Sequence, residues 1–296
     1  MNRHTRTLAL ASIALAGALV GCLGAPVEDS APDQTVGAAT GFTLDTTGIS
    51  AAPAATLPSA RLPLGAFTEA NVARNLLGSA ETFAPLSTLG SRVNVESATW
   101  HLERDSSKGQ LFAFHTPLMG DEVAQSDAQL QSASTALLAR WGVPATEIVR
   151  TLQRRLMSRD EDNSVIADAP RLIDHKTFFF RGINGVPIEG HRAVVTWGRD
   201  GSLRRVLLRW PALAASGHRL RTTLSVSQIR SRALTALRNA GETSGVARLR
   251  WKYVATAQAD GSVTLALMVG ARLASSTNTN GTTEEAREID VDVSAR

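Results

Sequence analysis

The sequence predicts an α+β protein built from repeated units, each a helix followed by an antiparallel meander, with the helices packed on one face of the sheets. Two segments carry the period of an amphipathic helix together with capping residues. Several others alternate between apolar and polar residues and end at turn signals. The same order of helix and then strands occurs in both halves of the chain, which predicts the repetition.

The two longer helices are predicted from spacing and from their caps. Residues 126–141 carry apolar side chains three and four positions apart, at Leu130, Ala133, Leu137, Leu138 and Trp141. Ser126 is a suitable N-cap, and Gly142 with Pro144 ends the helix. Residues 225–240 repeat the pattern, with inward positions at Ile229, Ala233, Ala236 and Leu237. A shorter helix is expected over residues 68–77.

The strands are predicted from period-two alternation and from the turns between them. The expected strands are 92–104, 110–115, 148–157, 174–181, 190–197, 203–210, 246–257, 262–274 and 287–293. The dipeptide Asn184-Gly185 between two of them is a strong hairpin signal. In the strand that contains "RLRWKYV", Arg248, Arg250 and Lys252 share one side, which we expect to be wet and basic.

The N-terminus has the pattern of a secreted, lipid-anchored chain. Arg3 and Arg6 precede an apolar stretch over residues 8–20 that is too short to span a bilayer as a mature helix. The stretch closes in Leu19-Val20-Gly21-Cys22, which resembles the lipobox of bacterial lipoproteins. That resemblance implies cleavage before Cys22 and acylation of this residue, the one cysteine in the chain. Leu23 follows where an aspartate would resemble an inner-membrane retention signal, which favours the outer membrane if the organism has one.

Composition divides the chain into four parts. Residues 1–21 are the expected lipoprotein signal peptide, and the Ala-, Pro- and Thr-rich residues 22–65 the expected flexible tether. Residues 66–215 and 216–296 are expected to form two α+β domains. The formal net charge of +4 falls to +2 without Arg3 and Arg6, which is not the balance of a nucleic-acid-binding protein.

Charge is uneven along the chain. Eleven arginines lie between Arg199 and Arg250, against only Asp200 and Glu242, while acidic residues gather near the C-terminus. One interpretation is that these regions form adjacent strands whose opposite charges pair. The other is a site for anionic headgroups, wall polymer or an acidic peptide. The candidate residues for such a site are Arg205, Arg209, Trp210, Arg248, Arg250, Trp251 and Lys252, with the two tryptophans lining a groove.

Motifs typical of catalytic, metal-binding or cofactor-binding sites are missing from the sequence. The histidines His101, His115, His175, His191 and His218 show no ligand spacing, so no metal or other cofactor is expected. No nucleophile elbow, phosphate loop or dinucleotide fingerprint occurs. Paired carboxylates such as Glu161-Asp162 and Glu284-Glu285 lie in polar stretches typical of solvated charge. We therefore expect a protein that is not an enzyme.

A family resemblance covers residues 126–294. An aromatic strand, "NGVPIEG", an alternating strand, "DG" and a further alternating strand resemble the propeptide domain of fungalysin- and thermolysin-type metallopeptidases. The unit that begins at Leu224-Ser225 and ends in "EIDVDVS" is similar to the PepSY module. An unrelated cystatin-like meander with the same turns is the alternative. The resemblance implies folding assistance or inhibition of a peptidase, yet the sequence contains no His-Glu-x-x-His motif.

These observations lead to one functional hypothesis and one alternative. The hypothesis is a non-catalytic, lipid-anchored cell-envelope protein that restrains or assists a secreted metallopeptidase, or binds another extended polypeptide. The alternative is a structural lipoprotein whose arginine-rich face binds cell wall or anionic lipid. In both, the N-terminal lipid attaches the chain to the membrane.

Overall fold

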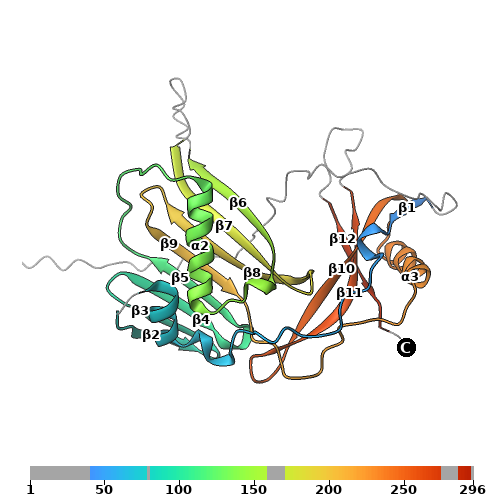
Figure 1. The fold of residues 1–296 in the computed structure, drawn as a ribbon, viewed down its shortest axis with the longest axis horizontal. Coiled ribbons are helices and arrows are strands. Elements are labelled where there is room, and N and C mark those ends of the chain that lie inside the picture. The colour runs from blue at the N-terminus through green and yellow to red at the C-terminus, as the bar shows by residue number, and fades with distance from the viewer. Residues whose placement is uncertain (1–40, 79–80, 159–170, 275–285, 295–296) are drawn as a thin grey trace, which may run out of the picture. The chain divides into compact units, whose positions relative to one another are not determined.

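Twelve strands join in one mixed, mostly antiparallel sheet in the described part of the chain (Figure 1). The computed structural model describes residues 41–78, 81–158, 171–274 and 286–294, which all belong to one compact unit, Asp33–Arg296. The α+β fold class expected from the sequence is confirmed. Of the described residues, none forms a helix long and apolar enough to cross a bilayer.

The first part of the sheet holds eight strands. They are β2 (Ala84–Leu89), β3 (Arg92–Glu96), β4 (Trp100–Asp105), β5 (Gln110–His115), β6 (Ile148–Ser158), β7 (Arg171–Ile183), β8 (Val186–Gly198) and β9 (Leu203–Arg209). Every pairing among them is antiparallel, and β9 joins β8 to β5. Strands β7 and β8 meet at the predicted turn, where Asn184 has φ 53° and Gly185 has φ 80°. Both angles suit a tight hairpin turn.

The second part of the sheet is centred on β10 (Gly245–Ala257) and β11 (Val263–Leu273), a long antiparallel pair. Strand β12 (Glu288–Asp292) adds to β11, and β1 (Phe42–Asp45) lies parallel to the first residues of β10. A single parallel register pair, Tyr253 with Ile188, joins β10 to β8. The two parts of the sheet are therefore connected through the hairpin of β7 and β8.

Helices begin at the predicted caps. Helix α2 (Asp127–Trp141) opens with a capping box between Ser126 and Gln129, and α3 (Val226–Asn239) repeats the box at its own start. The short α1 (Glu69–Asn71) continues as a π-helical turn over Val72–Leu77. Along α2 one inward position differs from expectation, because Ser134 is buried and Ala133 is exposed. The hydroxyl of Ser134 accepts a hydrogen bond from the Trp197 indole at 2.8 Å, which explains a polar group there.

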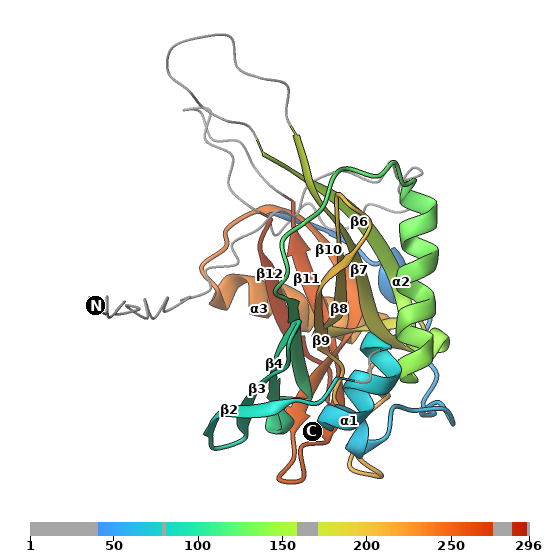
Figure 2. The same cartoon turned by 90° about the vertical axis from the view of Figure 1, so that its left-hand side faces the viewer.

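Two separate apolar cores lie on the sheet. The first contains α2 side chains such as Leu137 and Leu138 with one face of β5 and β7–β9, where Phe179 and Leu208 are buried. The second contains Ile229, Ala233 and Leu237 of α3 together with apolar side chains of β10, β11 and the β7–β8 hairpin. Figure 2 shows α2 lying along one face of its strands.

The expected tether ends earlier than residue 65. Phe42 and Leu44 on β1, and Ile49 and Leu62 after it, are all buried. The segment is held because β1 pairs with β10 through backbone hydrogen bonds, which composition does not reveal. Apolar residues are too sparse here to show a period. Residues 1–40, with the expected signal peptide and Cys22, lie outside the described residues.

A candidate binding face on the first part of the sheet

One face of β5–β9 is rich in cations and phenylalanines. Directly paired residues of antiparallel strands point to the same face, so the registers define three rows across five strands. We name this surface the cationic face. It consists of Gln110, Phe112, Phe114, Arg150, Leu152, Arg154, Lys176, Phe178, Phe180, Arg192, Val194, Thr196, Arg205, Leu207 and Arg209. The opposite face of these strands packs against α2, so the cationic face is the side away from that helix.

The charge of the cationic face is not balanced within it. Within β5–β9 its three rows contain six basic side chains and no carboxylate. On the neighbouring β4 the rows continue with Asp105 and Glu103, which pair with Lys108 and Arg92. Among the described residues, no ion pair involves Arg150, Lys176, Arg192, Arg205 or Arg209. Arg192 lies directly opposite Arg209, and Lys176 directly opposite Arg154. Like charges in directly opposed positions are destabilising, so this arrangement costs stability.

Aromatic rings hold some of these cations against the sheet. The Arg150 guanidinium lies 4.1 Å from the centroid of the Phe180 ring, and that of Arg205 lies 5.4 Å from Phe114. Both distances are in the range of a cation–π contact. The cationic face therefore offers a ligand both positive charge and apolar area.

A second group of cations lies close to Arg150. Burial, and then the guanidiniums of Arg250 on β10 and Arg272 on β11, lower the pKa of Arg150. Since Arg150 is on β6, which pairs with neither β10 nor β11, three strands from both parts of the sheet bring positive charge together here.

The cations on β10 have acidic partners among the described residues, unlike Arg150, Arg192, Arg205 and Arg209. Arg250 pairs with Glu288, and Lys252 contacts Glu189 at 3.1 Å, Glu288 at 3.1 Å and also Asp290. Burial opposes ionisation of Glu288, but Arg250 and Lys252 outweigh burial and lower the pKa of that carboxyl. Strand β12 thus brings carboxylates toward the β10 cations.

A missing side chain permits these contacts. Gly270 on β11 lies between Arg250 and Asp290 in the register, and a Cβ there would come within 2.3 Å of the Glu288 carboxylate. The lysine expected on a wet face is consequently buried, with Lys252 3% exposed. Arg248, the third of these cations, lies 3.7 Å from Asp45 on β1.

The two tryptophans proposed for a shared groove do not form one. Trp210 is fully buried in the first core and donates its Nε1 hydrogen to Glu147 at 3.0 Å. Trp251 belongs to the second core and donates to the carbonyl of Ala51 at 2.7 Å. Strand alternation explains the correction, because Trp210 lies one position from Arg209 and so points to the other face. Arg205 and Arg209 are the predicted site residues that lie on the cationic face.

Sequence reasoning missed most of the cationic face. Arg150, Arg192 and the four phenylalanines lie on strands that are distant in the sequence and meet only through the register. The alternation of Arg150, Leu152 and Arg154 was the available local signal. This alternation indicates that one face of β6 carries basic residues, but it does not indicate which strands pair with β6.

A buried polar network lies in the first part of the sheet, around Arg181 of β7. Arg181 and Glu147 are both fully buried and form an ion pair at 2.7 Å, and Arg181 also donates to the carbonyl of Pro211 at 2.6 Å. His191, 4% exposed, has no hydrogen-bond partner for Nδ1 among the described residues. Burial, followed by the charges of Arg181 and Arg209, lowers the pKa of His191 to about 3. This histidine is therefore neutral near pH 7.

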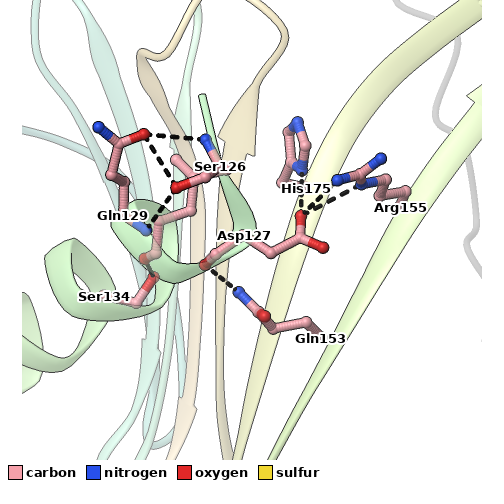
Figure 3. Close-up of polar contacts among 8 residues, drawn as sticks. Ser126, Asp127, Gln129, Ser134, Gln153, Arg155 and His175 are labelled. Atoms are coloured by element: carbon pink, nitrogen blue, oxygen red, sulfur yellow. Dashed lines mark hydrogen bonds and ion pairs between the residues drawn. The ribbon is translucent and has the colours of Figure 1, made fainter. Parts of the chain in front are cut away.

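The start of α2 gathers polar groups that bond the helix to β6 and β7. The Asp127 carboxylate contacts Arg155 at 3.0 Å and His175 at 3.6 Å, and the Asp127 carbonyl accepts a hydrogen bond from Gln153 (Figure 3). The nearby Ser126 hydroxyl accepts the hydrogen of the Gln129 amide as the helix cap. These bonds fix the helix start on β6 and β7. Within the described residues, no three His, Cys, Asp or Glu side chains are grouped to hold a metal ion.

Comparisons with known proteins identify no family. No protein-family model matches the chain, and no curated protein matches its sequence. Among solved structures, an uncharacterized protein from Eubacterium rectale is similar with a TM-score of 0.42 and 10% identity, over 85% of this chain and 87% of that one. The C-terminal domain of Bacillus megaterium YpeB is similar with a TM-score of 0.34 and 10% identity, over 74% of this chain and 95% of that one. Likenesses at these TM-scores carry no argument about function.

Proposed function

We propose that this protein is a non-catalytic binding protein of the cell envelope, whose cationic face binds an acidic segment of another polypeptide. The observation that carries the proposal is a set of five cations on β6–β9 that form no ion pair among the described residues, beside four phenylalanines: Arg150, Lys176, Arg192, Arg205 and Arg209. An acidic ligand would neutralise cations that repel one another in the free protein. The N-terminal pattern that ends at Cys22 supports attachment to a membrane through lipid.

Phenylalanines support a polypeptide as the ligand. Phe112, Phe114, Phe178 and Phe180 are each partly exposed between the cations. A peptide supplies both carboxylates for the cations and apolar side chains for these rings. The propeptide- and PepSY-like pattern of the sequence supports a secreted peptidase as the source of that polypeptide.

Binding to acidic probes tests the proposal. The full chain carrying Cys22→Ala would be titrated with labelled poly-glutamate and with a peptide that mixes glutamate and phenylalanine, at two salt concentrations. Replacing both Arg205 and Arg209 by glutamate should weaken binding at least tenfold. The matched control replaces Arg221 and Arg238, two exposed arginines outside the cationic face, in the same way.

The outcomes separate the candidate ligands. Equal binding by the test variant and the control would contradict the proposal. Binding to anionic vesicles or wall fragments, with neither peptide probe retained, would move the function to the scaffold alternative. High salt should weaken peptide binding, because exposed charges are screened.

A further inference from the structure

Strand β6 has an open edge beside the cationic face. It is 11 residues long and pairs along one side with β7, while on its other side no described strand pairs with it. An edge of this kind presents backbone N–H and C=O groups that another extended chain can pair with. Its length gives room for a strand of ordinary size.

The other ends of the sheet are less suited to such pairing. On β12, Arg232 donates to the carbonyls of Asp292 and Ser294, and Thr222 donates to that of Val293. Strand β2 is six residues long, has a register shift between Pro85 and Ser87 and carries no charged residue. Strand β6 shifts register with β7 only near its ends, next to Ile148 and Met157, so the stretch from Arg150 to Leu156 is regular. The β12 edge is therefore partly occupied by side-chain donors, and the β2 edge lacks charge that would select a partner.

Side chains on β6 indicate the chemistry of a partner strand. On the cationic face, Arg150 and Leu152 follow at alternate positions. The guanidinium of Arg272 adds positive charge near Arg150, whereas that of Arg250, also near, is paired with Glu288. The other side of β6 is engaged with α2, because Gln153 and Arg155 both bond to Asp127. A strand added to β6 would thus meet a cation and then an apolar side chain on one face.

We propose that β6 accepts an extended acidic segment of the partner polypeptide as an additional strand. The segment places a carboxylate beside Arg150 and an apolar side chain beside Leu152. This inference rests on the proposed function and specifies how the ligand binds. Pairing of β6 with a second copy of itself is opposed, since it would bring arginines together.

The experiment uses a matched pair of peptides. The first has the core Glu-Thr-Val-Thr-Glu with acetylated and amidated ends. The second has the same sequence with alternate backbone nitrogens methylated, which keeps the charge and removes the edge hydrogen bonds. With the full Cys22→Ala chain, methylation should weaken binding at least tenfold. Amide hydrogen exchange in residues 149–157 should slow when the unmethylated peptide binds, whereas exchange in β2 should not change.

A charge exchange tests the predicted pairing at Arg150. Arg150→Glu should weaken binding of the acidic peptide about tenfold and strengthen binding of a peptide with Lys in place of Glu. Arg150 is exposed on an edge strand, so the variant should fold, and Arg74→Glu is the control. Recovery of binding by the basic peptide would not follow from a merely damaged fold.

Each outcome has a distinct meaning. Equal binding of the two acidic peptides, or protection in β2 in place of β6, would overturn strand addition while leaving the proposed function standing. If no acidic peptide or poly-glutamate binds, both the inference and the proposed function fall. Methyl-sensitive binding with protection of residues 149–157 supports both.

Discussion

The buried His191 makes folding stability depend on acid in a way that one substitution removes. His191 is 4% exposed beside the buried Arg181, and its pKa falls from 6.5 to about 3 on folding. The unfolded chain therefore binds the proton first as the pH decreases. The stability contributed by neutral His191 is fully present above about pH 6.5 and is lost progressively toward pH 3.

The size of the effect follows from the two pKa values. Linkage gives a loss of about 2–3 kcal/mol between pH 7 and pH 4.5, where the unfolded histidine is charged and the folded one is still neutral. In the variant His191→Gln this contribution is absent. Carboxylates that titrate in the same range are shared by both proteins, so their effects cancel in the comparison.

Urea unfolding, followed by tryptophan fluorescence at pH 7 and pH 4.5, measures the difference. The wild-type free energy of unfolding should fall more than that of His191→Gln by about 2–3 kcal/mol. Any cost of the substitution that does not depend on pH drops out. Equal losses in the two proteins would refute the argument that His191 is held neutral by burial and by Arg181.

Three further predictions concern charge, backbone and lipid. Arg192→Glu should raise the free energy of unfolding by about 0.5–1 kcal/mol at low salt, since it replaces a like-charge pair with Arg209 by an attractive one, and 1 M salt should abolish the gain. Gly185→Val should lower the free energy of unfolding by about 1–2 kcal/mol, because residue 185 has a φ of 80° that strains a β-branched side chain. No atom lies within 4 Å of an added Cβ, so backbone strain is the whole cost. Gly65→Val, which is also in open space but has no positive φ, should cost less in the same urea or thermal unfolding. Cys22→Ala should move the protein from the membrane to the soluble fraction in cell fractionation, and unchanged membrane attachment would contradict lipidation.

Local patterns determined most of the secondary structure. The two capping boxes, at Ser126 and Ser225, and the Asn184-Gly185 turn depend on contacts between residues close in sequence, so their signals were visible without a fold. The alternation of β10 likewise placed Leu249 inside and Arg248 outside. These features confirm that period and capping follow from short-range physics.

Features that depend on register were beyond the sequence. Burial of Lys252 needs β12 to bring two carboxylates across Gly270, and the role of β1 needs a partner some two hundred residues away. Neither contact has a local signal. Backbone pairing over long separations fixes which charges meet, and composition along the chain records only that both signs are present.

The sequence by itself determined the α+β class, the helix caps, the β7–β8 turn and the expectation of a lipid anchor, because each depends on neighbouring residues. Only the tertiary structure decided which arginines are paired. It joined the β10 cations to carboxylates and left Arg192, Arg205 and Arg209 together on one sheet face. The physical reason is that charge pairing depends on distance in space, which the strand registers set.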